Sequence, residues 1–273
     1  MKLCAFADEA SVNLDGQIKA LKRNDMTLLE IRGVDGENIK DISSKKIIEI
    51  KKALDENGLG VWSIGSPIGK SDPTVNFDKQ IDDLKHVIES AQILGAKKIR
   101  MFSFHTYDEK VVLNSLEKFL KVVPSDITLC HENEKNIYGD IIERCVKIHT
   151  TFPEIKAVFD PANFVQCGVD TKEAWEALSP YVEYMHIKDA LKTGEVVPAG
   201  QGVGNLKYLL SEYKKLGGEV VTLEPHLMEF YGLSKLENGQ SLNHAASFND
   251  TDEAFDIGAN ALKSLLKELN SWR

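Results

Sequence analysis

Cysteine is scarce in this sequence, and its spacing excludes the usual thiolate sites. The four cysteines stand at positions 4, 130, 145 and 167, and no two of them form a CxxC pair. A zinc knot held by thiolates is therefore excluded. Cys4 and Cys130 lie in apolar runs typical of strands, which indicates reduced thiols in or near the core. Reduced thiols are typical of the cytoplasm, where we expect this protein to be.

Positive charge is also in the minority. The chain has 33 Lys and Arg residues against 42 Asp and Glu residues, which gives a formal net charge of −9 and a pI near 5.4. Proteins that bind a phosphate backbone present clustered positive charge. The acidic balance argues against a nucleic-acid partner and favours a small-molecule ligand.

Long apolar runs and linkers are missing as well. No run reaches the roughly 18 apolar residues of a membrane helix. Asp8 and Glu9 interrupt the N-terminal MKLCAFADEA before a signal-peptide apolar region forms. No linker rich in Gly, Ser or Pro divides the 273 residues. We therefore expect no membrane partner and one domain over 1–273, although two smaller domains are the alternative from length alone.

Eight short apolar runs alternate with eight amphipathic segments. Strands are predicted over 2–8, 27–33, 59–65, 97–104, 126–132, 155–160, 182–189 and 220–224. Helices are predicted over 13–25, 43–58, 78–95, 108–121, 138–149, 171–179, 204–216 and 251–270. This alternation predicts a parallel sheet with right-handed crossovers, and the count of eight predicts closure into a single-domain (β/α)8 TIM barrel. A doubly wound open sheet is the alternative, but FADEASVNLDG after the first strand lacks the glycine fingerprint of a dinucleotide site.

Four successive strands in the second half end at or near a side chain that can bind a metal. These residues are Glu132, Asp160, His186 and Glu224. Parallel strands bring their carboxyl ends to one face, where distant ligands can converge. Three carboxylates and one imidazole make a mixed oxygen and nitrogen site suited to Mn²⁺, Mg²⁺, Co²⁺ or Zn²⁺. Polar residues at strand ends are common in any barrel, but four in succession favour one divalent metal ion.

Two long loops are predicted on the same face. Residues 189–203 contain Gly200 and Gly202 and lead to Gly204, so their amides could hold a phosphate ahead of a helix. The second loop, 225–250, carries Phe230, Tyr231, His244 and Phe248. Connections this long are usually functional or disordered. A lid over the metal and an oligomer contact are both open interpretations.

Six short motifs, in this order and spacing, resemble those of the xylose isomerase-like TIM barrels. They are ADEA, LLEIRG, HENE, FDPANF, HIKD and TLEPH, and the resemblance covers essentially the whole chain. That group also holds ketose 3-epimerases, inosose dehydratases and endonuclease IV-type DNA repair enzymes. In its epimerase branch a Glu, an Asp, a His and a second Glu hold a divalent metal, and these fall on the same four residues. The chain departs from the family pattern at two positions. Asn163 stands where several members have His. Lys192 lies near the position of the expected substrate-contacting Arg, and Lys cannot form the bidentate contacts of a guanidinium.

The resemblance implies a metal-dependent isomerase or epimerase that acts on a sugar or a sugar phosphate. Proton removal next to a carbonyl gives an enediolate, which a divalent cation stabilises as a Lewis acid. One carboxylate must then act as base and a second acid must return the proton. We expect Glu132 and Glu224 to be this pair as well as metal ligands. Return of the proton to the same carbon gives epimerisation and to the neighbouring carbon gives isomerisation, and both stay open.

Seven further residues are candidates for substrate contact, and five of them have a plainer alternative. His105 and Lys188 could simply be solvated, His226 could belong to a turn, and Arg32 could pair internally with Glu30 on the second strand. Core packing is the alternative for Trp62, as for Phe104 and Phe164. The candidates are His105, Asn163, Lys188, Lys192, His226, Arg32 and Trp62.

Other functions remain as alternatives. An inosose-type dehydratase would begin with the same deprotonation and then expel hydroxide. A non-catalytic sugar-binding barrel is consistent with Asn163 and Lys192. A DNA repair endonuclease would need a basic face and more histidine ligands than a chain with seven histidines and a net charge of −9 offers. We expect a small sugar or sugar phosphate as partner, and a homo-oligomer is possible.

Overall fold

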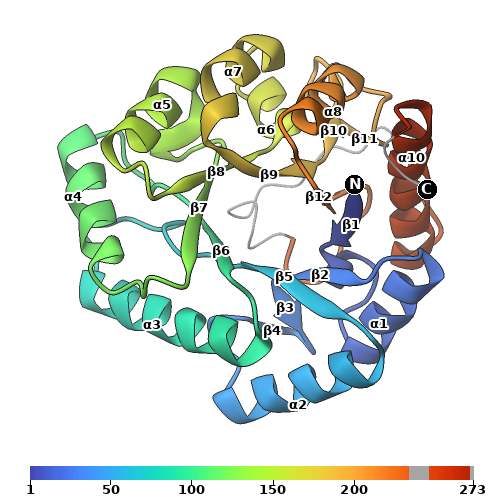
Figure 1. Cartoon of the computed structure of the whole chain (residues 1–273), viewed down its shortest axis with the longest axis horizontal. Helices are drawn as coiled ribbons and strands as arrows, with labels where there is room; N and C mark the ends of the chain where they lie inside the picture. Colours follow the sequence, from blue (N-terminus) through green and yellow to red (C-terminus); the bar gives the residue numbers. More distant parts are fainter. Residues whose placement is uncertain (234–245, 271–273) are drawn as a thin grey trace.

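Eight parallel strands form a closed barrel in the computed structural model, which describes residues 1–233 and 246–270 (Figure 1). Around the barrel their order is β1, β12, β9, β8, β7, β6, β5, β2, so that β1 pairs with both β12 and β2 and closes the ring. The predicted TIM barrel is therefore confirmed and the open sheet is wrong. The strands are β1 (Lys2–Ala5), β2 (Leu28–Ile31), β5 (Gly60–Gly65), β6 (Lys98–Met101), β7 (Thr128–Glu132), β8 (Lys156–Phe159), β9 (Val182–Ile187) and β12 (Val220–Leu223).

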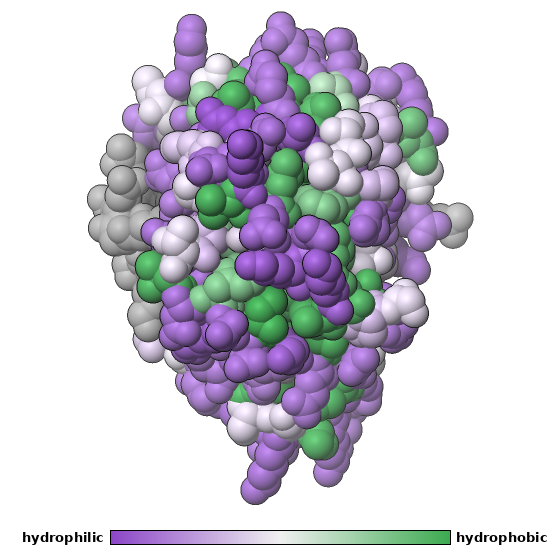
Figure 2. Space-filling view, turned by 90° about the vertical axis from the view of Figure 1, so that its left-hand side faces the viewer, coloured by the Kyte–Doolittle hydropathy of each residue, from purple (hydrophilic) through white to green (hydrophobic). Residues whose placement is uncertain are grey.

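Helices surround the barrel and bury their apolar faces against it (Figure 1). Side-chain caps at several N-termini fix where they begin: Ser43 accepts a hydrogen bond from the Lys46 amide, and Asp170 accepts from those of Lys172 and Glu173. On the side at the left of Figure 1, hydrophilic side chains cover most of the surface (Figure 2). The helices are α1 (Leu14–Arg23), α2 (Ser44–Glu56), α3 (Phe77–Leu94), α4 (Glu109–Leu120), α5 (Ile142–Thr151), α6 (Pro161–Gln166), α7 (Thr171–Leu178), α8 (Leu206–Lys215) and α10 (Thr251–Glu268).

The elements differ from the prediction mainly at their ends. The first strand stops at Ala5, and a 3-10 helix η1 (Ala7–Glu9) carries the acidic residues that follow it. The helix predicted over 138–149 begins as a separate 3-10 turn η2 (Tyr138–Asp140), and η3 (Ser179–Tyr181) follows α7. Part of the loop 225–250, including His244, lies outside the described residues.

Two small hairpins stand on the carboxyl face of the barrel. The stretch 189–203, predicted as a plain loop, contains the antiparallel strands β10 (Asp189–Ala190) and β11 (Val196–Val197). A similar pair, β3 (Gly33–Val34) and β4 (Glu37–Asn38), follows β2. Both hairpins extend the rim above the strand ends, where a ligand site of this fold is expected.

The opposite end of the barrel interior is filled by apolar side chains. Cys130, Val158 and Tyr184 form a buried cluster, and Trp62 packs on it with its ring perpendicular to that of Tyr184. The Tyr184 hydroxyl donates to Glu30, which begins the polar layer above. The cluster of Cys130, Val158, Tyr184 and Trp62 is therefore a packed floor of the barrel interior. The polar side chains from Glu30 up to the carboxyl face form what we call the chamber. In the described part of the chain, no helix combines the length and the hydropathy that crossing a bilayer requires.

Candidate metal centre

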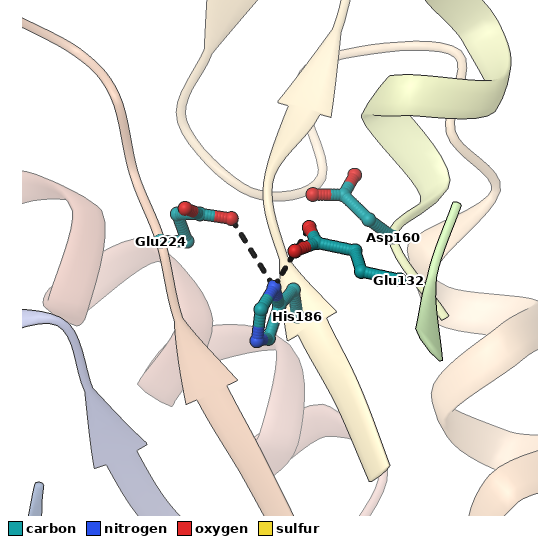
Figure 3. A group of neighbouring side chains, drawn as sticks. All are labelled: Glu132, Asp160, His186 and Glu224. Carbon is teal, nitrogen blue, oxygen red and sulfur yellow. Dashed lines mark hydrogen bonds and ion pairs between the residues drawn. The ribbon is translucent and has the colours of Figure 1, made fainter. Parts of the chain in front are cut away.

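Four side chains from consecutive strands of the barrel meet at the carboxyl face. Glu132 is the last residue of β7, Asp160 directly follows β8, His186 lies in β9 and Glu224 directly follows β12. Each offers a ligand atom, and these atoms all lie within 4.8 Å of one another (Figure 3). All four side chains are buried. The predicted convergence of four distant residues is thus present in the structure.

The imidazole of His186 lies at the centre of this group. Its Nδ1 is 3.0 Å from Glu132 Oε1 and 3.3 Å from Glu224 Oε2, and Figure 3 shows the two carboxylates approaching it from different sides. Its Nε2 is 3.2 Å from Glu30 Oε2, below the site. The ring is therefore held by acids at both nitrogens.

Two carboxylate oxygens of the group lack a hydrogen bond. Asp160 Oδ2 and Glu224 Oε2 are buried and have no hydrogen-bond partner among the described residues. Buried polar atoms are rarely left so, because an unmade hydrogen bond costs about 1–3 kcal/mol. Lys188 Nζ forms ion pairs with both, at 3.0 Å from Asp160 Oδ2 and 3.7 Å from Glu224 Oε2. Each of these oxygens has a second lone pair beyond its contact with Lys188, and carboxylate oxygens next to an imidazole fit a divalent cation.

Arginines hold the outer oxygens of both glutamates. Arg100 Nε lies 3.1 Å from Glu132 Oε2, and Arg32 Nη1 donates to Glu224 Oε1 at 2.9 Å. The amide of Asn163 also donates to Glu132 Oε1, at 3.4 Å. Contacts of this kind fix the orientation of ligands around a metal.

Burial and neighbouring charge shift the pKa values of Asp160 and Glu224 in opposite directions. Burial raises the pKa of Asp160 to about 6, although the ammonium of Lys188 works against it. Burial also acts on Glu224, but Lys188 and then His226 outweigh it and hold the pKa of Glu224 well below its usual range. Glu224 is therefore an anion at neutral pH.

His186 and the acids around it form a cluster with excess negative charge. Although burial opposes its charged form, Glu132 and Glu30 raise the pKa of His186 well above 6.5. Without another cation a proton therefore sits on the ring, and a metal ion would replace it. Six buried carboxylates share this chamber with four Lys and Arg cations: Glu9, Glu30, Glu132, Glu134, Asp160 and Glu224 with Arg32, Lys70, Arg100 and Lys188.

Arg32 lies in the site, but not as the partner of Glu30. Its guanidinium is bonded to Asp8 at 2.9 Å and to Glu9 at 3.2 Å, in addition to Glu224. Glu30 instead accepts from the hydroxyls of Tyr184 and Thr222, at 2.8 and 2.9 Å. The predicted Glu30–Arg32 ion pair is therefore wrong, because other partners lie closer to each group.

His226 also reaches the site. Its Nε2 lies 3.3 Å from Glu224 Oε1 and 3.4 Å from Glu9 Oε1. Its backbone amide donates to Glu9 Oε2 at 2.7 Å, and its φ of +44° is unusual for a residue other than glycine. Together with Lys188, Asn163 and Arg32, it is one of four substrate candidates that border the metal ligands.

Three candidates are not brought to the site. Trp62 packs on the floor at the other end of the barrel, with Lys98 Nζ 4.0 Å from its ring centre. Lys192 is exposed in the turn between β10 and β11. His105 is half-buried in the loop after β6, where its Nδ1 lies 2.9 Å from the carbonyl oxygen of Asn136. Phe104 and Phe164 belong to the hydrophobic core.

The glycine amides that were predicted to bind a phosphate already donate hydrogen bonds to another anion. The Asp189 carboxylate accepts hydrogen bonds from the amides of Gly200, Gly202 and Gly204, at 2.8, 3.0 and 3.0 Å. The loop does bind a negative group, but this group is the chain's own side chain.

Several residues of the chamber were not among the predicted site residues. Asp8 and Glu9 lie in the ADEA motif, and Glu134 follows Glu132 by two residues in HENE. These two motifs could therefore have identified the three acids as site residues. Lys70 pairs with Glu134 at 3.1 Å, and Arg100 points inward from β6. No pattern in the sequence distinguished these two from solvated cations.

A family model described as xylose isomerase-like TIM barrel matches residues 18–251. The chain belongs to this family. The family's TIM barrel agrees with the observed fold, and the resemblance stated from the motifs is confirmed. No curated protein matches the chain by sequence.

Solved structures similar to this family member include enzymes and a metal-bound protein. The IOLI protein with a bound zinc atom is 18% identical, with a TM-score of 0.75 over 98% of this chain and 99% of that one. D-psicose 3-epimerase in the presence of D-fructose is 14% identical, with a TM-score of 0.74 over 98% and 99%. The probable 3-DHS dehydratase AsbF from Bacillus anthracis is 14% identical, with a TM-score of 0.74 over 96% and 99%. At these identities the likeness shows the fold alone.

Proposed function

We propose that this protein holds one divalent metal ion and isomerises or epimerises a small sugar. The ligands are Glu132, Asp160, His186 and Glu224. The observation that carries the proposal is the meeting of their donor atoms within 4.8 Å, with two buried carboxylate oxygens that lack a hydrogen bond. The zinc bound to the IOLI protein and the epimerase among the similar structures agree with it.

Glu132 and Glu224 are the acid and base of this proposal. They come from β7 and β12 and flank His186 Nδ1 (Figure 3). The carbonyl end of a sugar placed at this point meets one carboxylate from each side. One takes a proton from the carbon next to the carbonyl, and the other returns a proton. When bound, the metal ion supplies Lewis-acid stabilisation of the charge that develops on the carbonyl oxygen.

The surrounding side chains position the reacting groups. Arg32 and Arg100 hold the two glutamates by their outer oxygens, which leaves the inner oxygens directed at the site. Lys188 and His226 line the small cavity at the centre and can donate to sugar hydroxyls. The buried setting excludes bulk water and strengthens each of these interactions.

Metal analysis and solvent deuterium exchange test the proposal. The purified protein is analysed for metal, loaded with Mn²⁺ and incubated with a panel of aldoses and ketoses in D₂O. We expect deuterium to enter one sugar, detected by NMR, with no loss of water. Loss of water would instead identify a dehydratase. Tight sugar binding without exchange would identify a non-catalytic barrel.

A further inference from the structure

A second, larger cavity opens on the carboxyl face beside the metal centre. Its volume is about 430 Å³, within the roughly 300–1,000 Å³ of pockets that take drug-sized ligands. It lies between the β3–β4 hairpin and the segment that follows β12. Its apolar wall consists of Val12, Val34, Pro67, Phe230 and Tyr231, together with the glycines Gly33, Gly36 and Gly232.

This cavity adjoins the proposed metal centre. Arg32 and Lys70 line it, and both also line the small central cavity that contains Glu132 and Glu224. The central cavity has room for little more than one water-sized group. The rest of a substrate whose carbonyl lies at the two glutamates must therefore lie outside the central cavity, and the larger cavity on the other side of Arg32 adjoins it.

The cations that line the larger cavity are already neutralised. Arg32 is bonded to Asp8, Lys40 to Asp41, and Lys70 to Glu134. Asp8 and Asp41, together with Glu37, also line this cavity and repel an anion. A phosphate would find no free cation among these lining residues, so the space fits an uncharged group.

Two aromatic rings give the cavity a flat apolar surface. The guanidinium of Arg32 is sandwiched between Phe6 and Phe230, at 4.3 and 4.9 Å from the ring centres, which fixes Phe230. Tyr231 is 62% exposed. Its ring lies over Gly36, where an added Cβ would stand 3.4 Å from the ring atoms. An exposed ring that rests on backbone is a platform for stacking.

We infer that the substrate carries an uncharged ring at the end remote from its carbonyl, and that this ring stacks on Tyr231. The inference rests on the proposed function for the position of the carbonyl. It selects a ring-substituted sugar, such as a disaccharide with a free reducing end, over a monosaccharide or a sugar phosphate.

Three ketoses with the same reacting end test it: fructose, isomaltulose (6-O-glucosyl-fructose) and fructose 6-phosphate. Affinity for the Mn²⁺-loaded protein is measured by calorimetry, and deuterium incorporation by NMR. We expect isomaltulose to bind about 2- to 10-fold more tightly than the other two, which is the contribution of one stacked ring. Tyr231→Ala should remove this preference and leave fructose binding unchanged. Tyr107→Ala, at a tyrosine that is 58% exposed elsewhere on the surface, is the matched control and should change neither.

The outcomes separate this inference from the proposed function. Absence of deuterium exchange with every sugar removes the proposed reaction, but a Tyr231-dependent preference in binding still supports the ring site. Equal binding of fructose and isomaltulose, tighter binding of fructose 6-phosphate, or equal effects of the two tyrosine variants would overturn it.

Discussion

Glu132 and Glu224 differ from the other acids of the chamber in facing both an arginine and the imidazole of His186. Glu132→Gln and Glu224→Gln should each lower turnover by about 10²–10⁴-fold, because an amide cannot transfer the proton. Far-UV circular dichroism should stay unchanged. Glu183→Gln, at the opposite end of β9 and paired with Lys98, is the control and should keep full activity. Full activity in either test variant would remove the acid–base proposal.

In the proposed centre, Lys188 would compete with a metal ion for Asp160. Its ammonium lies 3.0 Å from Asp160 Oδ2, and although burial opposes the charge, Asp160 and Glu224 raise the pKa of Lys188 well above its usual range. Lys188→Met should tighten Mn²⁺ binding by about 10-fold or more, because one positive charge near the ion is gone. Calorimetry measures the affinity, and Lys98→Met, at the opposite end of the barrel, should leave it unchanged. Equal or weaker affinity in Lys188→Met would contradict this interpretation.

At the scale of single residues, the sequence predicted the position of each residue along its strand, but it did not predict which residues its side chain contacts. The four proposed ligands follow from their positions at strand ends. Trp62 was misplaced because it lies early in β5, and position along a strand decides which end of the barrel a side chain reaches. Glu30 and Arg32 do share one side of β2, but longer-range partners decided their pairing.

Among the elements, the hairpin of β10 and β11 depends on one buried carboxylate. Asp189 accepts from four backbone amides, those of Ala190, Gly200, Gly202 and Gly204. Asp189→Ala should lower the free energy of unfolding by about 3 kcal/mol, since charge-assisted bonds contribute about 1.5–3 kcal/mol each and water restores some. Urea unfolding measures this change. Thr193→Ala, in the exposed turn of the same hairpin, should change stability by less than about 0.5 kcal/mol. A similar small loss in Asp189→Ala would show that water replaces the carboxylate.

Helix α5 carries a buried histidine that makes stability depend on pH. Burial lowers the pKa of His149 to about 4, and its Nδ1 lies 3.0 Å from the Ile155 carbonyl oxygen. Between pH 6.5 and 4 the unfolded chain binds this proton more readily than the folded chain. His149 should therefore contribute a loss of stability of about 3 kcal/mol as pH drops through this range, in addition to that from His131, whose pKa burial also lowers.

Urea unfolding between pH 4 and 7 tests the role of His149. His149→Asn keeps a donor near Ile155 but cannot ionise, so its stability should fall less on acidification. His105→Asn removes a loop histidine and should retain the slope of the original protein. An unchanged slope in His149→Asn would assign the acid sensitivity to other groups.

At the scale of the whole molecule, the fold was predictable because the same strand and helix pattern repeats along the sequence. Eight apolar runs spaced by amphipathic segments specify strand order and closure whatever the details at their ends. The hairpins on the rim were missed because β3, β4, β10 and β11 are two residues each, too short for a periodic pattern. The single domain over 1–273, the cytoplasmic location, the lid and the homo-oligomer stay predictions.

If the chamber binds a divalent cation as proposed, the stability of the barrel should depend on that cation. A ligand that binds only the folded state at 100 times its Kd contributes about 2.7 kcal/mol. Mn²⁺ should therefore raise Tm by roughly 5 °C or more, as measured by scanning calorimetry, and a chelator should reverse the shift. The double variant Glu132→Gln, Asp160→Asn should show no shift. A Tm that is insensitive to Mn²⁺ in the original protein would count against the proposed metal site.

The pairing of β1 with β12 has a consequence for how the protein is made. Among the barrel strands, β1 leaves the ribosome before the others and its partner β12 leaves last, so the ring stays open until β12 emerges. Glu224 and His226 arrive with that late strand, opposite Asp8 and Glu9 from the earliest turn. A polypeptide from which β12 has not yet emerged therefore lacks both the closed wall and Glu224, so the proposed site is complete only after that strand is made.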